Sequence, residues 1–414
     1  MRSEVTAERK LPPGGPASPD TALPPRAAAS ILRTSRLRLL PASFHHPHTP
    51  MAHGALDTPQ ATLRDAERFA LEILPAVSRT FALSIRVLPG DLGRAVLSAY
   101  LLCRIADTVE DEPTLPAAEK AALLDRLAAC FADPAEVPAL GRRLAALAGD
   151  PAHVRLAANA ERVFTLYAAL PERSRAHVRT WVEEMVRGMR KFVVLYPNGI
   201  RIQTLDEYRE YCYYVAGTVG YMLTDLWHEH SPSIGAARHK VLRERCRAFA
   251  EALQTVNILK DVAQDAEREN SIYIPEHALR EHGSGHATLL SPAHLRANRA
   301  ALASLVKLAW ADLDDALGYF LLLPRRALSI RLFCALPLLF AYATMRDLTR
   351  STAMLVAGGG VKISKAEVKS LLVAGPLLVA SNSGVRWLVE RVRLRAFVLG
   401  WSRAPRAPGA LAPS

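Results

Sequence analysis

Apolar residues recur along most of this chain at the spacing of one α-helical face. From about residue 57 onward, hydrophobic side chains return at i, i+3, i+4 and i+7 in one segment after another. Proline and glycine clusters separate these segments, as at Pro89-Gly90 and around Pro324. The predicted helices are Leu63–Ile73, Leu92–Thr108, Ala117–Phe131, Ala152–Ala169, Ser174–Arg190, Leu205–Trp227, His239–Asp265, Pro292–Leu322 and Leu328–Thr349.

The order of these segments predicts the fold class. No stretch alternates apolar and polar residues as a half-buried strand does, and none has the composition of an internal linker. We therefore predict one all-α domain of long packed helices over residues 57–400. Residues 1–56 lack sustained periodicity, which predicts a disordered or untranslated extension with Met51 as an alternative start. Residues 401–414 are predicted to be a disordered tail.

Composition narrows the range of partners. The chain has 414 residues, half of them hydrophobic, and a net charge of +12, which suits an anionic substrate or a membrane surface. The basic residues are spread through the helical segments and form no nucleic-acid-binding motif, so we expect no nucleic-acid partner. The five cysteines include no CxxC pair, which predicts neither a disulfide framework nor a zinc site and suits a reducing cytosol. Because no run reaches about 18 uninterrupted apolar residues, we expect no membrane-spanning helix.

Two helical segments break their apolar pattern with a pair of aspartates four residues apart. Asp107 and Asp111 end AYLLCRIADTVED, with Glu110 bordering the same face, and Asp261 and Asp265 end ALQTVNILKDVAQD. Residues i and i+4 lie above one another on a helix, so the carboxylates of each pair are neighbours. Desolvating such a pair without a partner would cost on the order of several kcal/mol.

A hard divalent cation supplies that partner, because Mg²⁺ binds carboxylate oxygens, water and substrate phosphates. In the second segment, Gln254 and Asn257 extend the polar stripe with amide oxygens. A single pair of this kind is more typical of a solvated helix face. Two pairs, each near a basic residue (Arg104 or Lys260), favour Mg²⁺ ions held around a diphosphate. Such a site suits metal-assisted departure of diphosphate from an allylic carbon.

Further candidates for substrate contacts lie upstream. Ser78 and Arg79 are adjacent in VSRTF, and a hydroxyl beside a guanidinium can hold phosphate oxygens. The alternative for Ser78 is an N-cap of the helix that follows. Tyr100 lies four residues before Arg104 and would point into the same cavity.

Six segments, in order along the chain, resemble the squalene/phytoene synthase family. They are SRTFALSIRVLP (78–89), YLLCRIADTVED (100–111), EMVRGM (184–189), YCYYVAGTVGYML (211–223), LQTVNILKDVAQD (253–265) and FCALPLLFAYAT (333–344). The resemblance implies a single-domain isoprenoid-synthase helical bundle around a large apolar cavity for two prenyl chains. It also implies that both acidic motifs bind Mg²⁺, through Asp107, Glu110, Asp111, Asn257, Asp261 and Asp265.

The resemblance assigns a role to Tyr211, in the position of a tyrosine proposed to assist the proton loss that closes a cyclopropane. A phenol beside a carbocation can accept a proton, and its ring attracts the cation. Tyr208 and Tyr214 lie on the same predicted helix, so spacing alone leaves the assignment open. Val215 and Phe333 would contribute to the apolar wall that surrounds the substrate.

The segment VKISKAEV (361–368) resembles the lysine-containing segment that the squalene synthase branch uses near its nicotinamide cofactor. The resemblance places Lys362 and Ser364 at cofactor phosphate positions, with Arg79, Arg104 and Lys260 adding charge. That branch has arginine where Ser364 and Lys260 stand. Neither residue here can donate the two parallel hydrogen bonds that a planar guanidinium group provides. The alternative for the segment is a solvated loop after three consecutive glycines.

The resemblance implies a prenyltransferase that joins two molecules of farnesyl diphosphate through presqualene diphosphate to squalene, with Mg²⁺ and NADPH. Three alternatives stay open: a phytoene or dehydrosqualene product made without NADPH, arrest at presqualene diphosphate, and a non-catalytic prenyl-lipid-binding helical protein. We expect a cytoplasmic monomer, with peripheral contact to a membrane left open.

Overall fold

The computed structural model describes residues 59–399, apart from the side chains of residues 59–61 and of Arg79. The predicted all-α class is confirmed: this part of the chain is built of helices, with one isolated parallel bridge between Arg201 and Ile272 and no strand. The expectations for residues 1–56 and 401–414 lie outside the described residues.

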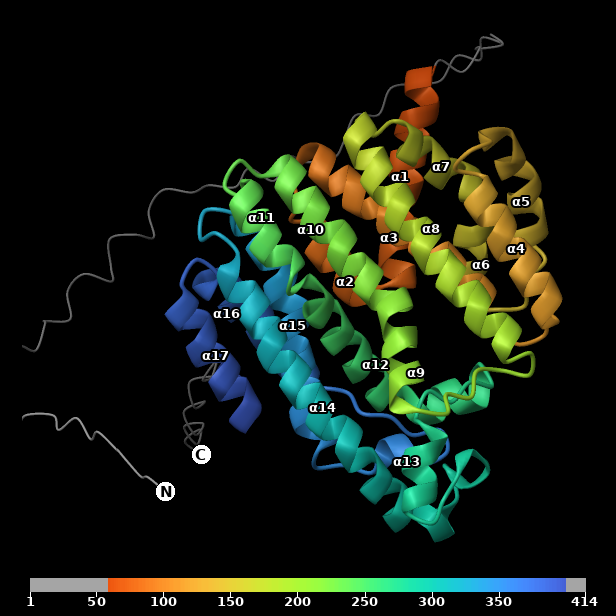
Figure 1. The fold of residues 1–414 in the computed structure, drawn as a ribbon. Coiled ribbons are helices and arrows are strands. Elements are labelled where there is room, and N and C mark those ends of the chain that lie inside the picture. The colour runs from red at the N-terminus through yellow and green to blue at the C-terminus, as the bar shows by residue number, and fades with distance from the viewer. Residues whose placement is uncertain (1–58, 400–414) are drawn as a thin grey trace, which may run out of the picture. The chain divides into compact units, whose positions relative to one another are not determined.

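The helices follow one another with short connections (Figure 1). In the first half they are α1 (Pro59–Val77), α2 (Arg79–Ile85), α3 (Gly90–Glu110), α4 (Ala117–Ala129), α5 (Val137–Leu144), α6 (Pro151–Ala158), α7 (Ala160–Ala168), α8 (Glu172–Leu195) and α9 (Leu205–Cys212). A π-helical segment (Tyr213–Gly217) leads into α10 (Thr218–His230). The second half contains α11 (Ala236–Arg243), α12 (Cys246–Arg268), α13 (Glu276–Glu281), α14 (Leu295–Leu322), α15 (Leu328–Leu348), α16 (Lys365–Leu378) and α17 (Asn382–Leu394).

Short polar side chains begin several of these helices, as their sequence predicts. Ser78 accepts a hydrogen bond from the N–H of Phe81 at 3.2 Å, so the capping interpretation of Ser78 is the one that the structure shows. Asp150 caps α6, and Thr204 caps α9. Each cap satisfies a backbone donor that the first turn of a helix leaves without a partner.

Three predicted helices are interrupted. The segment 152–169 divides into α6 and α7 at Asn159, whose backbone is not helical. The segment 239–265 divides into α11 and α12 before Cys246, and 205–227 contains the π-helical segment. Apolar periodicity continues across these breaks because the pieces on either side bury the same face, and periodicity alone therefore does not reveal them.

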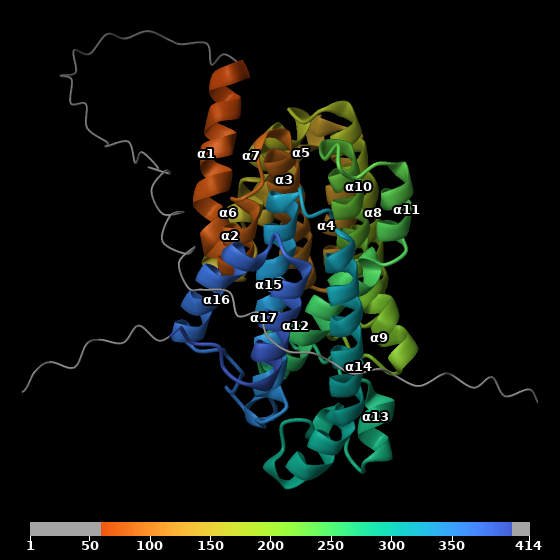
Figure 2. The same ribbon diagram turned by 90° about the vertical axis from the view of Figure 1, so that its left-hand side faces the viewer.

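Five long helices, α3, α8, α10, α12 and α15, form the centre of the described domain (Figures 1 and 2). The helices α4 to α7 cover α3 and α8 on one side, and α14, α16 and α17 cover α12 and α15 on the other. Two of the central helices approach closely at Gly220 of α10, where a Cβ atom would lie 2.4 Å from the carbonyl oxygen of Cys246. Only glycine permits that approach, which brings α12 close to α10.

One helix differs from the expectation that no segment could span a membrane. Within residues 59–399, α15 alone has the length and apolar composition to cross a bilayer. In its most apolar stretch, 78% of the residues are buried inside the protein. The helix also carries Arg331, which is fully buried and binds backbone carbonyl oxygens. In this fold α15 is a core helix.

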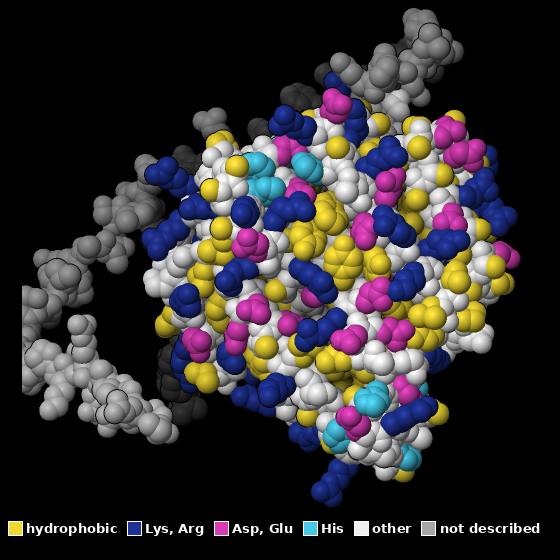
Figure 3. All heavy atoms as spheres, viewed as in Figure 1, with side chains coloured by type: hydrophobic (Ala, Val, Ile, Leu, Met, Phe, Trp, Pro, Cys, Tyr) yellow, Lys and Arg dark blue, Asp and Glu magenta, His cyan; other side chains and the backbone are white. Residues whose placement is uncertain are grey.

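The surface is charged with both signs. Figure 3 shows lysine and arginine side chains distributed over the visible face among aspartates and glutamates, not gathered into one stripe. The five cysteines are all buried and none forms a disulfide.

Candidate active site

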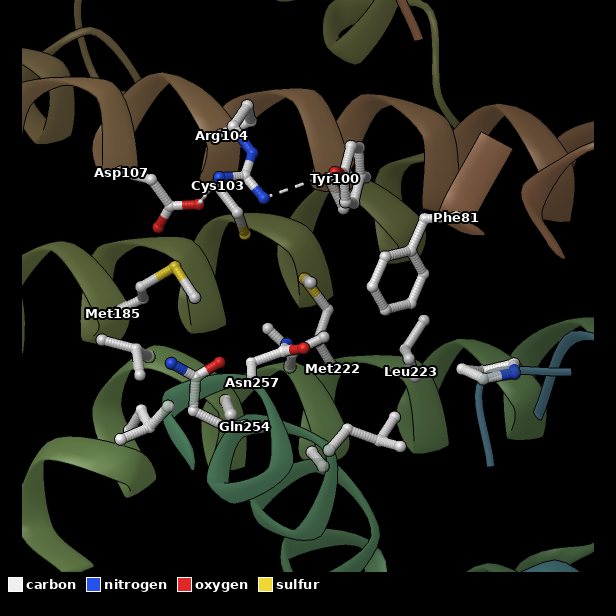
Figure 4. Close-up of a pocket in the computed structure, with 18 of the residues that line it drawn as sticks. Phe81, Tyr100, Cys103, Arg104, Asp107, Met185, Met222, Leu223, Gln254 and Asn257 are labelled. Carbon is white, nitrogen blue, oxygen red and sulfur yellow. Dashed lines mark hydrogen bonds and ion pairs between the residues drawn. The ribbon is translucent and has the colours of Figure 1, made fainter. Parts of the chain in front are cut away.

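A cavity of about 400 Å³ lies among the central helices. Its walls come from α2, α3, α8, α9, the π-helical segment, α10, α12 and α15. Much of the lining is apolar, and Figure 4 shows Phe81, Met185, Met222 and Leu223 around the space. The predicted site residues that line it are Tyr100, Arg104, Asp107, Glu110, Asp111, Tyr211, Val215, Gln254, Asn257, Lys260, Asp261, Asp265 and Phe333.

On α3, a basic side chain reaches toward the acidic ones. Arg104 Nη1 lies 3.3 Å from Oδ2 of Asp107, and Arg104 Nη2 donates to the hydroxyl of Tyr100 at 3.5 Å (Figure 4). Asp107 lies three residues after Arg104 and Tyr100 lies four residues before it, so the helix places all three side chains next to one another. Arg104 therefore offers its positive charge at the edge of the acidic cluster.

On α12, the polar stripe predicted from the sequence faces the cavity. Gln254 and Asn257 point into it, two turns and one turn before Asp261 (Figure 4). Lys260 forms an ion pair with Asp261. The stripe thus presents two amides, an ammonium group and two carboxylates along one side of the helix.

The acidic residues of α3 are held in an environment that disfavours their ionisation. Burial is the largest cause, and it raises the pKa of Asp107, Glu110 and Asp111. Neighbouring carboxylates raise the pKa of Glu110 and Asp111 further, whereas Arg104 opposes the rise for Asp107. A cation placed among these carboxylates would relieve both effects.

The two acidic motifs meet across the cavity. Burial, together with repulsion from Asp261 and Asp111, raises the pKa of Asp265 to about 8. Glu269 in turn repels Asp111 and raises its pKa. Because each helix perturbs the carboxylates of the other, the two pairs that are about 150 residues apart in sequence form one acidic cluster.

The residues present fit a divalent cation bound together with an anionic substrate. Glu110 Oε1 is buried without a hydrogen-bond partner, which is costly for a carboxylate oxygen in a closed cluster. No three His, Cys, Asp or Glu side chains between residues 62 and 399 converge closely enough to hold an ion by themselves. Mg²⁺ suits that arrangement, because it usually binds one or two carboxylates and completes its shell with water and substrate phosphate.

Tyr211 links the acidic cluster to the apolar part of the cavity. It is almost fully buried, and its hydroxyl donates to Oε2 of Glu110 at 3.3 Å. Its ring stacks on Tyr273 at 4.8 Å and meets the edge of Phe192 at 5.1 Å. Burial, followed by repulsion from Glu110, raises the pKa of the phenol, which therefore stays protonated. Tyr208 does not line the cavity, and Tyr211 does.

Of the lining residues that the sequence analysis did not single out, Glu269 and Tyr273 lie nearest the acidic cluster in their charge interactions. Glu269 continues the four-residue spacing of Asn257, Asp261 and Asp265, and this signal could have identified it. Burial and the neighbouring Asp265 raise the pKa of Glu269 to about 8. Tyr273 follows the end of α12, and helical spacing could not have placed it in the cavity.

Of the residues predicted to bind a nicotinamide cofactor, Arg104 and Lys260 line the cavity, and Lys362 and Ser364 do not. The hydroxyl of Ser364 caps α16 by accepting a hydrogen bond from the N–H of Glu367 at 3.1 Å. The preceding loop lies along α12, where the N–H of Gly358 donates to the carboxylate of Glu267 at 3.0 and 3.2 Å. The cofactor roles of Lys362 and Ser364 stay predictions.

Two further predicted residues remain without a tested role. Ser78 does not line the cavity, although Phe81, whose N–H it binds, does. Arg79 is the first residue of α2, and its side chain lies outside the described part of the protein. The predicted phosphate contacts of both stay predictions.

The fold and the site define an all-α protein with a largely apolar cavity, into which α3 and α12 bring a cluster of carboxylates. Residues 74–367 match the squalene/phytoene synthase family, and the chain belongs to that family.

Curated relatives agree with this membership, and a solved structure shares the fold. The squalene synthase of Schizosaccharomyces pombe is 28% identical over 311 residues, which cover 74% of this chain and 64% of that protein. Squalene synthase 1 of Arabidopsis thaliana is 29% identical over 292 residues, which cover 67% and 64%. The chain thus spans just under two thirds of the length of these relatives. A ligand complex of TcSQS shares the fold, with a TM-score of 0.69 and 23% identity over 82% of this chain and 94% of that chain.

Proposed function

We propose that the protein is a prenyltransferase of the squalene synthase type. It joins two molecules of farnesyl diphosphate head to head, through presqualene diphosphate, to squalene, with Mg²⁺ and NADPH. The observation that carries the proposal is the convergence of two acidic helices at one end of an otherwise apolar cavity. The family and the curated squalene synthases support it.

The acidic cluster holds the diphosphate end of the substrate. Bound Mg²⁺ supplies the positive charge that stabilises the departing diphosphate. Asp107 and Asp111 from α3, with Asp261 and Asp265 from α12, provide the carboxylate oxygens for it. Lys260, next to this cluster in the lining, adds a positive charge for phosphate oxygens.

The apolar walls hold the prenyl chains and protect the reactive carbon. Loss of diphosphate leaves an allylic cation, which water would capture if it had access. Phe81, Leu223 and Phe333 exclude water from the part of the cavity beyond the acidic cluster. The ring faces of Tyr100 and Tyr211 add attraction for a cation without acting as nucleophiles.

Tyr211 and Glu110 provide a path for the proton that is lost when the cyclopropane closes. The Tyr211 phenol stays protonated, so it can accept a proton on oxygen only by passing its own proton onward. Glu110 accepts the phenolic hydrogen bond, so its carboxylate, when ionised, is the next acceptor along this path. The departing diphosphate is a second base within the same site.

A second candidate function follows from the position of the cofactor residues. Because Lys362 and Ser364 do not line the cavity and Ser364 is engaged as a helix cap, the reaction could end before a hydride is delivered. The product would then be presqualene diphosphate or, after a proton loss, dehydrosqualene, and the same ending with geranylgeranyl diphosphate as substrate would give phytoene. The shared first half-reaction would use the same carboxylates.

Product analysis distinguishes the candidates. Purified full-length protein is incubated with farnesyl or geranylgeranyl diphosphate and Mg²⁺, with and without NADPH, and the lipid extract is examined by mass spectrometry. We expect squalene only when NADPH is present. Dehydrosqualene or presqualene diphosphate in both reactions would favour the second candidate. Turnover of neither farnesyl nor geranylgeranyl diphosphate would refute both and favour a non-catalytic lipid-binding role.

We also propose that the protein is monomeric and works in the cytoplasm. Size-exclusion chromatography coupled to light scattering tests the first part, and a stable dimer at assay concentration would contradict it. Microscopy of a tagged full-length protein in its own cells tests the second.

A further inference from the structure

The outward face of α16 is apolar where a surface helix is usually polar. Its exposed positions recur every three or four residues, as the outer side of a packed helix requires. Val373 is 46% exposed and Leu377 is 76% exposed. On the inner side, Gly375 lies against Leu336 and Leu339 of α15. The helix therefore already packs on the protein through its other face, and the exposed apolar residues are not needed for that packing.

A second exposed segment shares this end of the protein. The connection between α14 and α15 exposes Arg325, Arg326 and Leu328, the last of which is 51% exposed. Buried Arg331 joins the two segments: it donates to the carbonyl oxygen of Leu323 on one side, at 2.7 Å. On the other side it donates to the carbonyl oxygen of Val379, just after α16, also at 2.7 Å, and to Asn382 at 2.8 Å. We call the combined surface the basic-apolar face; it consists of Arg325, Arg326, Leu328, Lys369, Val373 and Leu377.

Along the stretch of chain that forms this face, the exposed charge has one sign. Between residues 316 and 389 the only acidic residues are Asp347 and Glu367. Both pair with Arg346, and Glu367 is fully buried. The same stretch exposes basic side chains and no free carboxylate. Two copies of such a face would repel one another. An anionic bilayer complements it, because the headgroups attract the basic side chains and the hydrocarbon beneath them accommodates the apolar ones.

The face also lies close to the apolar part of the cavity. Helix α15 is the only layer between them along this direction: Phe333 and Pro337 line the cavity, while Leu336 and Leu339 of the same helix touch Gly375 of α16. Figure 2 shows α15 beside both α16 and α17. A bilayer on this side would therefore face the wall of the cavity that lies away from the acidic cluster.

We propose that the basic-apolar face docks the protein on an anionic lipid bilayer. Lysine and arginine side chains bind the headgroups, and Leu328, Val373 and Leu377 enter the interface beneath them. The proposal does not depend on catalysis, so it can stand or fall separately from the proposed function.

Vesicle flotation with the full-length protein tests it. The vesicles are phosphatidylcholine alone or phosphatidylcholine with phosphatidylglycerol. We expect binding to the anionic vesicles, weakening with salt, and little binding to the neutral ones. Leu328→Glu should lower binding to anionic vesicles about tenfold. The double variant Arg325→Gln/Arg326→Gln should lower binding to anionic vesicles about tenfold at low salt, and by a smaller factor at high salt.

Leu195→Glu is the matched control. Leu195 is also 51% exposed, and it ends α8, which Figures 1 and 2 place on the opposite side from α16. It should bind as the wild type does. Circular dichroism and thermal unfolding of each variant establish that it is folded. Failure of the wild type to bind anionic vesicles, or equal losses in Leu328→Glu and Leu195→Glu, overturns the proposal. If the protein forms a dimer without lipid and Leu328→Glu abolishes that dimer, the face binds a second copy of the chain. That result would also overturn the proposal.

Discussion

Raising the pH of the metal-free protein ionises carboxylates that the fold crowds into a largely apolar cavity. The pKa of Asp265 is raised from 3.8 to about 8, and that of Glu269 from 4.5 to about 8, mainly by burial. The folded protein therefore binds these protons more tightly than the unfolded chain does. Their contribution to stability is fully present below about pH 4 and is lost as the pH rises through about 8.

The size of the loss follows from the pKa values. At about 1.4 kcal/mol for each tenfold change, the raised pKa of Asp265 alone corresponds to roughly 6 kcal/mol. Water and salt reach the cavity, and Asp265 and Glu269 share one repulsion, so we discount the combined loss to about 3 kcal/mol. For a domain of this size that loss lowers the melting temperature by about 5 °C.

Thermal unfolding in a chelating buffer at about pH 5 and about pH 9 measures this loss. Because other groups also titrate, the informative quantity is the pH dependence of wild type minus that of Asp265→Asn. The wild type should lose roughly 3 °C more than the variant, which still carries Glu269, and Mg²⁺ at the higher pH should recover part of the loss. Asp125→Asn, at an exposed position of α4, is the control and should behave as the wild type. Equal pH dependence in wild type and Asp265→Asn would refute the reasoning.

Three further changes have expected outcomes. Tyr211→Phe removes the hydrogen bond to Glu110 but keeps the ring, so we expect the formation of presqualene diphosphate to slow by roughly 10²- to 10⁴-fold in single-turnover assays, with stability lowered by only about 1 kcal/mol. Arg346→Met leaves the buried carboxylate of Glu367 without its two-point partner, and urea unfolding should show a loss of about 3–5 kcal/mol. Gly220→Ala places a methyl group against a backbone carbonyl of α12, and should cost about 1–3 kcal/mol in the same assay; an unchanged midpoint would contradict the close approach of α10 and α12.

The long helices could be predicted from the sequence because each buries one continuous face. The helices that were not predicted are short or contain helix breakers. Helix α13 has six residues, too few for a periodic signal, and α16 continues through Gly375 and Pro376. Packing of Gly375 against α15 stabilises α16, and local helix propensity does not reveal a tertiary contact of this kind.

The same distinction applies to the site. The acidic pairs could be predicted because i and i+4 spacing and an apolar surround are local features. Glu269 has the same spacing and could have been predicted in the same way. Tyr273 could not, because it lies beyond the end of α12 and its position depends on how the chain turns there. The positions of Lys362 and Ser364 likewise depend on a loop whose path is set by contacts with α12, such as that of Gly358 with Glu267.

The central claim is that α3 and α12 together form one site for a prenyl diphosphate. The most direct test is the rate of diphosphate release from farnesyl diphosphate, with Mg²⁺, by the wild type and by the single variants Asp107→Asn and Asp261→Asn, each carrying one change on one helix. The account predicts turnover by the wild type and a loss of about 100-fold or more in both variants, while both stay folded. Full activity in either variant would contradict it, because one helix alone would then suffice.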